Sequence, residues 1–219
     1  MFVLFLGALF ETQPAIAAGA TLGQEHFGIM IGKIPVAAEP AVELPVALDF
    51  GGIDDATPSY VKATLLALHQ CGRRFAKALT AEEQEELGGQ IIPLNIVVMV
   101  LNATAAVQDC IHEVFSRRGL AVLAGTHVAD DRLQNAILLG EVDTAARETL
   151  TLACMFTEFQ AADLHNAPGG EAISVTGWNN RLAALYRQRL LRRRTEGRTH
   201  RFVPLANQVT SHGQILLRQ

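Results

Sequence analysis

Residues 173–205 read ISVTGWNNRLAALYRQRLLRRRTEGRTHRFVPL, a stretch in which a helical pattern is followed directly by a hairpin pattern. Ser174 is placed to cap the helix. Apolar side chains that recur at intervals of three and four predict its inner side, formed by Val175, Trp178, Leu182 and Leu185. Downstream, LLRRRT and RTHRFVPL flank Glu196 and Gly197, a pair suited to a two-residue hairpin turn.

The opposite side of this helix is polar and carries Thr176, Gly177, Asn179, Asn180 and Arg181. Asn can pair with adenine through two hydrogen bonds, Arg can pair with guanine, and Thr reaches phosphates or a thymine methyl group. The alternative is a merely solvated face, although two adjacent Asn are mediocre helix formers and such a face usually uses better ones. We expect Trp178 to pack in the core, because it shares the register of the inner leucines.

The hairpin that follows is strongly basic, with Arg192, Arg193, Arg194, Arg198, His200 and Arg201. We expect phosphate contacts from these side chains, although strand alternation lets only some of them face the same side. Residues 181–219 hold 9 Arg and one acid, whereas residues 1–180 hold 9 Lys and Arg against 21 acids. A concentrated basic segment is typical of proteins that bind a phosphate backbone, and the alternative is a solvated, Arg-rich tail.

Two more helices are predicted upstream, at DTAARETLTLACMF (143–156) and EFQAADLHNA (158–167). FQAADL, ISVTGWNNRLAAL and LLRRRTEGRTHRFVPL together resemble the winged-helix domain of transcription regulators. The resemblance implies a helix-turn-helix whose third helix enters the major groove of duplex DNA while the hairpin wing lies along the backbone. This class commonly has a Gly where Arg189 closes the recognition helix here.

The first half of the chain alternates strand and helix patterns. VALDF (46–50), IVVMVL (96–101) and LAVLAG (120–125) read as buried strands, and SYVKATLLALHQCGRRFAKAL (59–79) and AAVQDCIHEVFSRR (105–118) read as helices. Asn102 or Thr104 can cap the second helix. This alternation predicts an α/β domain with a mixed or largely parallel sheet.

Within that half, LDFGGIDDATPSYVKATLLAL (48–68) resembles the strand, turn and helix at the centre of STAS-like domains. The resemblance extends over residues 1–125 and implies a unit that senses a signal or docks on a protein. The position at which the classical family can carry a phosphorylated Ser holds Pro58 here. For the neighbouring Thr57 and Ser59 we expect helix capping instead.

The N-terminus imitates a secretory signal, with MFVLFLGALF followed by AIAAGA. No Lys or Arg precedes Lys33, so a first buried strand at residues 2–10 is favoured over secretion. Thr12 can cap a helix with Pro14 in its first turn, running to about residue 32. IPVAAEPAVELP (34–45) reads as a loop and GGIDDATP (51–58) as a turn.

No catalytic motif stands out. Cys71, Cys110 and Cys154 are far apart and form no CxxC pair, which fits buried thiols in a reducing compartment and predicts no metal site. The pair Asp54 and Asp55 lies in a turn without a His or metal-ligand partner. We expect no catalytic residue and no cofactor.

These patterns predict a cytoplasmic regulator with a STAS-like α/β domain (1–125), a connector (126–140), a winged-helix domain (141–205) and a C-terminal tail (206–219). DDRLQNAILL (130–139) would add a short helix to the connector. The expected partner is double-stranded DNA, bound by a homodimer that acts as a repressor. Two alternatives stay open: a module that docks on a protein through the winged helix, and an enzyme built on the N-terminal domain.

Overall fold

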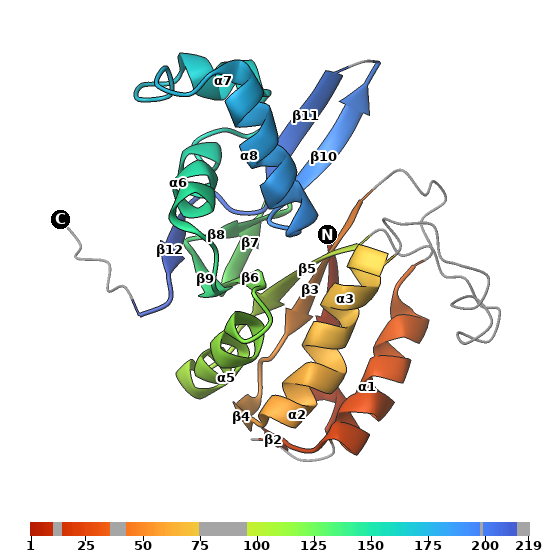
Figure 1. Cartoon of the computed structure of the whole chain (residues 1–219). Coiled ribbons are helices and arrows are strands. Elements are labelled where there is room, and N and C mark those ends of the chain that lie inside the picture. The colour runs from red at the N-terminus through yellow and green to blue at the C-terminus, as the bar shows by residue number, and fades with distance from the viewer. Residues whose placement is uncertain (11–14, 36–42, 75–95, 198, 214–219) are drawn as a thin grey trace.

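A six-stranded sheet runs through the centre of the computed structural model, which describes residues 1–10, 15–35, 43–74, 96–197 and 199–213 (Figure 1). In spatial order its strands are β1 (Phe2–Phe5), β3 (Leu44–Asp49), β5 (Ile96–Leu101), β6 (Ala121–Gly125), β9 (Ala136–Gly140) and β12 (Val209–Ser211). The first four strands are parallel, β9 is antiparallel to β6, and β12 is parallel to β9. The prediction of an α/β fold with a largely parallel sheet is confirmed.

Helices that link the parallel strands cover one face of the sheet. They are α1 (Ala20–Lys33), then α2 (Pro58–Val61), which continues through a π-helical turn, η2 (Lys62–Leu66), into α3 (Ala67–Arg74), and α5 (Ala105–Ser116). Thr57 caps α2 and Thr104 caps α5, each through its side-chain oxygen. The capping role expected for Thr57 is thus confirmed. Residues 75–79 of the predicted helix at 59–79 lie outside the described part of the chain.

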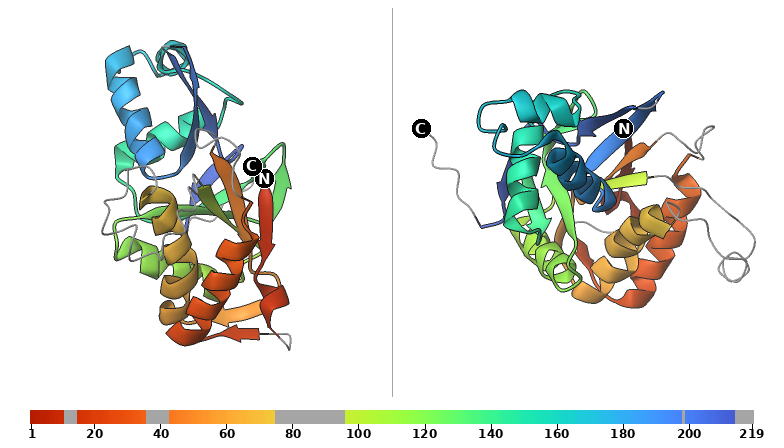
Figure 2. Two further views of the ribbon diagram at one scale, coloured as in Figure 1. Left: turned by 90° about the vertical axis from the view of Figure 1, so that its right-hand side faces the viewer. Right: turned by 45° about the horizontal axis from the view of Figure 1, so that its top comes forward.

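The C-terminal helices cover the opposite face. Alternate residues of β5 point to the two faces, so that Val98 and Val100 join the cluster under α1 and α5, while Val97 and Met99 join a second cluster. That second cluster also contains buried side chains of α6 (Thr144–Ala153) and α8 (Val175–Arg187). Figure 2 shows the two groups of helices from two further sides. The segment 141–205 therefore packs its apolar side directly on the sheet.

The segment 126–140 forms strands, and the predicted helix through residues 130–139 is wrong. β7 (His127–Ala129) and β8 (Arg132–Gln134) form an antiparallel hairpin, and β9 follows within the central sheet. Asp130 and Asp131 have φ angles of 52° and 60°, the left-handed pair that a tight two-residue hairpin turn requires. Asp adopts the left-handed conformation more readily than most residues do. The turn therefore forms here although the apolar residues of this segment recur at helical spacing. Part of the predicted tail is also structured, since β12 lies at a sheet edge.

Gly140 ends β9 at a position where only glycine fits. Its φ is 93°, and a Cβ atom built there would lie 2.2 Å from the Leu120 carbonyl oxygen. Its N–H donates to Nδ1 of His112 at 3.1 Å. This close approach lets α5 pack on the sheet next to β6.

The N-terminal region differs in detail from the prediction. The expected strand at 2–10 is limited to β1 and is followed by a 3-10 turn, η1 (Gly7–Leu9). β2 (Ala15–Ala17) pairs with β4 (Ile53–Ala56), which occupies part of the predicted turn, and Leu44 and Pro45 belong to β3. The helix α1 begins only at Ala20, while Thr12 and Pro14 lie outside the described residues. Among the residues described, no helix is both long and apolar enough to cross a membrane.

Candidate nucleic-acid interface

Three helices and a hairpin form the upper part of the molecule in Figure 1: α6, α7 (Ala161–Asn166), α8, and the strands β10 (Leu191–Glu196) and β11 (Thr199–Pro204). Between α6 and α7, Phe159 forms an antiparallel bridge with Phe202 of β11, with N–H to O distances of 3.0 and 2.8 Å. The short segment at Phe159 thus lies beside β11, on the side opposite to β10. The arrangement is three helices followed by a two-stranded antiparallel hairpin, to which Phe159 adds a single bridge.

The connection from α7 to α8 is fixed by one indole and one glycine. Nε1 of Trp178 donates to the Gly170 carbonyl oxygen at 3.0 Å, and the indole is buried. A Cβ atom on Gly170 would lie 1.8 Å from the Leu164 carbonyl oxygen, so the chain can pass α7 this closely only with glycine. The sequence-based expectation that Trp178 packs in the core is confirmed, and its ring anchors α8 against α7.

The helix α8 begins as predicted, with Oγ of Ser174 accepting the Gly177 N–H at 3.1 Å. Trp178, Leu182 and Leu185 are buried as expected. Val175, the first residue of the helix, is not buried, since its exposed fraction is 38%. The predicted inner side is therefore correct except for this residue.

The outer side of α8 carries the polar residues singled out in the sequence. Thr176, Asn179 and Asn180 are exposed, and Gly177 and Arg181 are partly exposed. The guanidinium of Arg181 lies over the Trp178 ring, 5.6 Å from its centroid. The structure therefore brings these five positions together on one accessible helical surface.

The hairpin register divides the basic residues between two faces. Arg194 pairs with Arg201 and Arg192 with Val203, so these side chains share the outer face of the hairpin. Arg193 lies opposite Phe202 and His200 opposite Thr195, on the face that packs toward α8 through the buried Phe202. Arg198 lies outside the described residues. Because Glu196 pairs with Thr199, Glu196 belongs to β10 and the turn starts one residue later than predicted.

The three outer arginines differ in their surroundings. Arg194 is exposed, and Nε of Arg201 donates to Oε2 of Glu196 at 2.8 Å. Arg192 is half-buried near the base of the hairpin, where desolvation lowers its pKa and the Asp131 carboxylate opposes this change. Asp131 in turn accepts a hydrogen bond from the N-terminal amine, which lowers its pKa. Of the three, Arg194 is thus the most accessible, while Arg201 is partly exposed and paired with Glu196.

At the other end of α8, Arg189 takes the conformation that a closing glycine would have. Its φ is 61°, its N–H donates to the Tyr186 carbonyl, and the Leu190 N–H donates to the Leu185 carbonyl. This is the bonding pattern with which helices commonly end on a left-handed residue. The guanidinium is buried in an ion pair with Glu43, a residue that sequence patterns did not single out.

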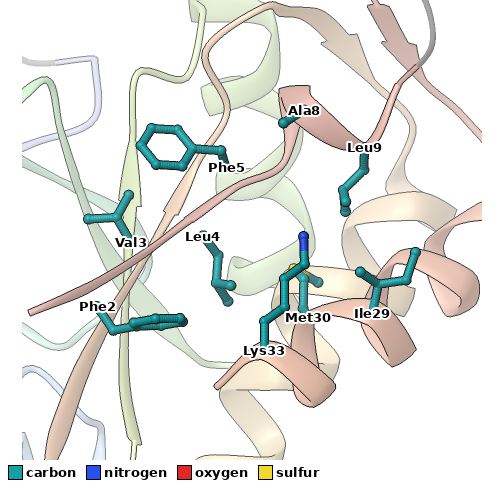
Figure 3. Close-up of a pocket in the computed structure, with 9 residues that line it drawn as sticks. All are labelled: Phe2, Val3, Leu4, Phe5, Ala8, Leu9, Ile29, Met30 and Lys33. Carbon is teal, nitrogen blue, oxygen red and sulfur yellow. The ribbon is translucent and has the colours of Figure 1, made fainter. Parts of the chain in front are cut away.

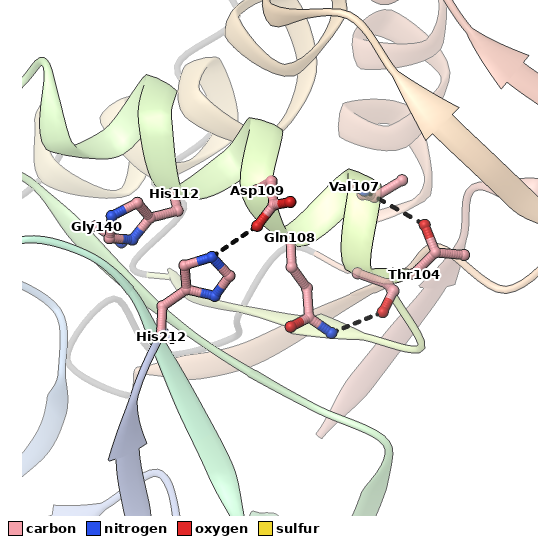
Figure 4. A network of polar contacts seen from close by, with 8 residues as sticks. Thr104, Val107, Gln108, Asp109, His112, Gly140 and His212 are labelled. Carbon is pink, nitrogen blue, oxygen red and sulfur yellow. Dashed lines mark hydrogen bonds and ion pairs between the residues drawn. The ribbon is translucent and has the colours of Figure 1, made fainter. Parts of the chain in front are cut away.

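A polar cluster on α5 and β12 is the strongest candidate for chemistry elsewhere in the described chain (Figure 4). Nε2 of His212 bonds to Oδ1 of Asp109 at 2.8 Å, and the rings of His212 and His112 lie 4.6 Å apart. Burial first, and then His212, lowers the pKa of His112, while Glu141 and Asp109 oppose this. Within the described ranges, His, Cys, Asp and Glu form no group that could hold a metal ion. The cluster fastens the end of β12 to α5.

Two further features lack the marks of an active site. The pocket between β1 and α1 measures about 180 Å³ and is apolar apart from Lys33 (Figure 3), whereas ligand pockets usually measure about 300 to 1,000 Å³. Burial raises the pKa of Cys110 to about 11 and that of Cys154 to about 12, so neither thiol is an activated nucleophile.

Asp54 and Asp55 are both exposed. The Asp54 carbonyl accepts a hydrogen bond from Thr104, and the Asp55 carboxylate accepts the Ala56 N–H. The prediction that this pair lies in a turn is wrong, because both residues belong to β4, where Asp55 pairs with Ile16 of β2.

In comparisons with known proteins, no family model, no curated protein and no solved structure matches this chain. The functional argument therefore depends on the geometry of α8 and the hairpin.

Proposed function

We propose that this protein is a DNA-binding transcriptional regulator of the winged-helix type, with α8 as the recognition helix and the β10–β11 hairpin as the wing. The observation that carries the proposal is the exposed polar surface of α8 beside a hairpin whose outer face holds Arg194 and Arg201, with the half-buried Arg192 at its base. Asn and Arg side chains on a helix can read base edges in the major groove, while arginines on the wing neutralise phosphates.

The local architecture supports this function. α6, α7 and α8 precede the hairpin, and a single antiparallel bridge joins Phe159 to Phe202 of β11. The buried indole of Trp178 and the close turn at Gly170 hold α8 against α7, so the exposed residues of α8 stand on a packed helix. A rigid, accessible helix loses little conformational entropy on binding DNA.

Residues 1–125, which supply four of the six strands of the central sheet, we propose to be a STAS-like domain that receives a protein or ligand signal. In support of this, β3, the turn at β4 and the helix from Pro58 follow one another as they do in that class. With Pro58 at the acceptor position and Thr57 engaged as a cap, regulation by phosphorylation at the helix start is not part of the proposal. Repression by a homodimer in the cytoplasm is the simplest output.

The experiment is selection of bound duplexes from a random DNA pool by the full-length protein, followed by affinity measurements on the selected and a scrambled duplex. Asn180→Ala and Arg181→Ala should each weaken binding to the selected duplex by about 1 to 3 kcal/mol and change binding to the scrambled duplex much less. Glu148→Ala, an exposed residue of α6, is the control and should leave both affinities unchanged.

Equal losses on the two duplexes would contradict a base-reading role for α8. If no duplex is retained at any salt concentration, the proposal fails, and docking on a protein partner becomes the better account of this surface.

A further inference from the structure

The carboxylate of Glu43 lies where three elements of the fold meet. Glu43 directly precedes β3 of the central sheet, and its Oε1 accepts a hydrogen bond from Nη1 of Arg189, just beyond α8, at 3.1 Å. Its Oε2 accepts the backbone N–H of Arg193, on β10, at 2.8 Å. One side chain therefore connects the sheet, the recognition helix and the wing.

This contact is enclosed. The side chains of Glu43 and Arg189 are each 3% exposed, and Tyr186 adds a further side-chain hydrogen bond to the carboxylate. The ring of Tyr186 also receives the guanidinium of Arg193, 4.2 Å from its centroid. Burial raises the pKa of Glu43, and the donors from Arg193, Arg189 and Tyr186 oppose that rise. The ion pair between Glu43 and Arg189 therefore forms although removing these charges from water costs free energy.

The direction of the Arg193 N–H shows which edge of the hairpin Glu43 holds. Because it bonds to Glu43, it points away from β11, so the carboxylate fastens the edge of β10 that β11 does not cover. The neighbouring Arg194 is on the outer face proposed to contact phosphates. The position of that face relative to α8 depends on where the edge of β10 is held.

Two unfavourable features coincide at this point. A buried ion pair is often no more stable than apolar residues of the same size, and a left-handed φ at a non-glycine residue is strained. An apolar residue at position 43 and a glycine at position 189 would avoid both costs. Their coincidence at the junction of helix, wing and sheet points to a role in geometry rather than in stability alone.

We propose that Glu43 is a positioning residue that sets the angle of the β10–β11 wing relative to α8 and links that angle to the central sheet. The inference rests on the proposed DNA-binding function and deepens it, because it names the contact through which a change at the start of β3 would reach the DNA-binding surface.

The test uses the full chain with Glu43→Gln and Glu43→Ala. Gln keeps an acceptor for the Arg193 N–H without the charge, and Ala removes the side chain. Glu113→Gln, which breaks an exposed ion pair with Arg117 on α5, is the matched control. Hydrogen exchange is measured on all four proteins without DNA, and affinity for the selected duplex is then measured at several salt concentrations.

We expect Glu43→Ala to speed exchange in β10 by roughly tenfold to 100-fold, as the loss of a charge-assisted hydrogen bond implies, with exchange in α5 unchanged. Glu43→Gln should have a smaller effect on exchange. Both variants should bind DNA more weakly than the wild type with a shallower salt dependence, since a displaced wing makes fewer phosphate contacts. The control should match the wild type in every measurement.

Unchanged exchange in β10 in both variants would overturn the positioning role. So would loss of protection in α5 as well, because Glu43 would then be a general core residue. The exchange measurements need no DNA, so a wild-type protein that binds no duplex refutes the proposed function separately from the role of Glu43 in holding the wing.

Discussion

Replacing Arg189 by glycine should have opposite effects on stability in two backgrounds. In the wild type the change removes backbone strain, because φ is 61° and a left-handed residue with a Cβ costs roughly 1 to 2 kcal/mol. It also leaves the Glu43 carboxylate, 3% exposed, without its ion-pair partner. Breaking a buried pair from one side costs about 3 to 5 kcal/mol, so Arg189→Gly should lower the free energy of unfolding by roughly 1 to 4 kcal/mol.

In a protein in which Glu43 is already Gln, we expect Arg189→Gly to change the free energy of unfolding in the opposite direction. There the buried guanidinium of Arg189 has already lost the Glu43 carboxylate, and Arg189→Gly removes both that charge and the strain. The second substitution should therefore raise the free energy of unfolding relative to Glu43→Gln alone. The coupling between the two positions, taken as the difference of the two effects, should be about 3 kcal/mol or more.

The assay is urea unfolding of the four proteins, followed by far-UV circular dichroism and by the emission of Trp178. Trp178 is the single tryptophan of the chain and is 3% exposed, so its emission reports on the packing of α8. Equal effects of Arg189→Gly in both backgrounds, or a gain of stability in the wild type, would refute the reasoning that the buried ion pair dominates the strain.

Three further predictions concern other parts of the molecule. Replacing Arg194 and Arg201 together by Gln should flatten the plot of log affinity against log salt by about 0.9 per lost phosphate contact, equally for selected and scrambled DNA; an unchanged slope would mean that the outer face of the hairpin does not touch DNA. Gly170→Ala should destabilise the protein by roughly 3 kcal/mol or more in urea unfolding, because the added Cβ would lie 1.8 Å from a carbonyl oxygen of α7, and a wild-type midpoint would contradict the close approach of this turn to α7. The folded-state pKa of His112 is lowered below 6.5, so the unfolded chain binds the proton more readily and stability is lost as pH falls through 6.5 toward the folded value. His112→Gln should reduce this loss in unfolding experiments between pH 7.5 and 5.5, whereas the exposed His127→Gln should retain it; identical pH profiles for all three proteins would exclude His112 as a source.

Several elements could be predicted from local patterns because their physical causes are local. IVVMVL is a continuous apolar run and VALDF is apolar except for Asp49, and a strand buried on both faces needs a largely apolar run. The start of α8 follows from Ser174, whose hydroxyl caps the helix without help from distant residues. The inner position of Trp178 follows from its spacing to the leucines of the same helix.

The failures also have identifiable causes. The segment DDRLQNAILL has apolar residues at helical spacing, but the left-handed turn at Asp130 and Asp131 and the partner strands β6 and β12 make it a hairpin strand and a sheet strand. Val175 fits the helical register, yet at the first turn of α8 its side chain stays 38% exposed in the described part of the chain. Strand pairing and coverage at helix ends depend on residues far away in the chain.

By itself, the sequence determined that the chain contains an α/β sheet, a capped helix with a polar outer side, and an arginine-rich hairpin, because periodicity, caps and charge are properties of neighbouring residues. Only the tertiary structure decided that the C-terminal helices cover the second face of the sheet and that Glu43 meets Arg189 across 146 positions of sequence. The hairpin arginines likewise read as one basic run, and only the register of β10 on β11 separates the outer Arg194 and Arg201 from the inward Arg193. Whether a charged side chain is buried, and which face of a strand points inward, depends on the distant segments that pack against them. Local sequence patterns do not encode which distant segments pack together.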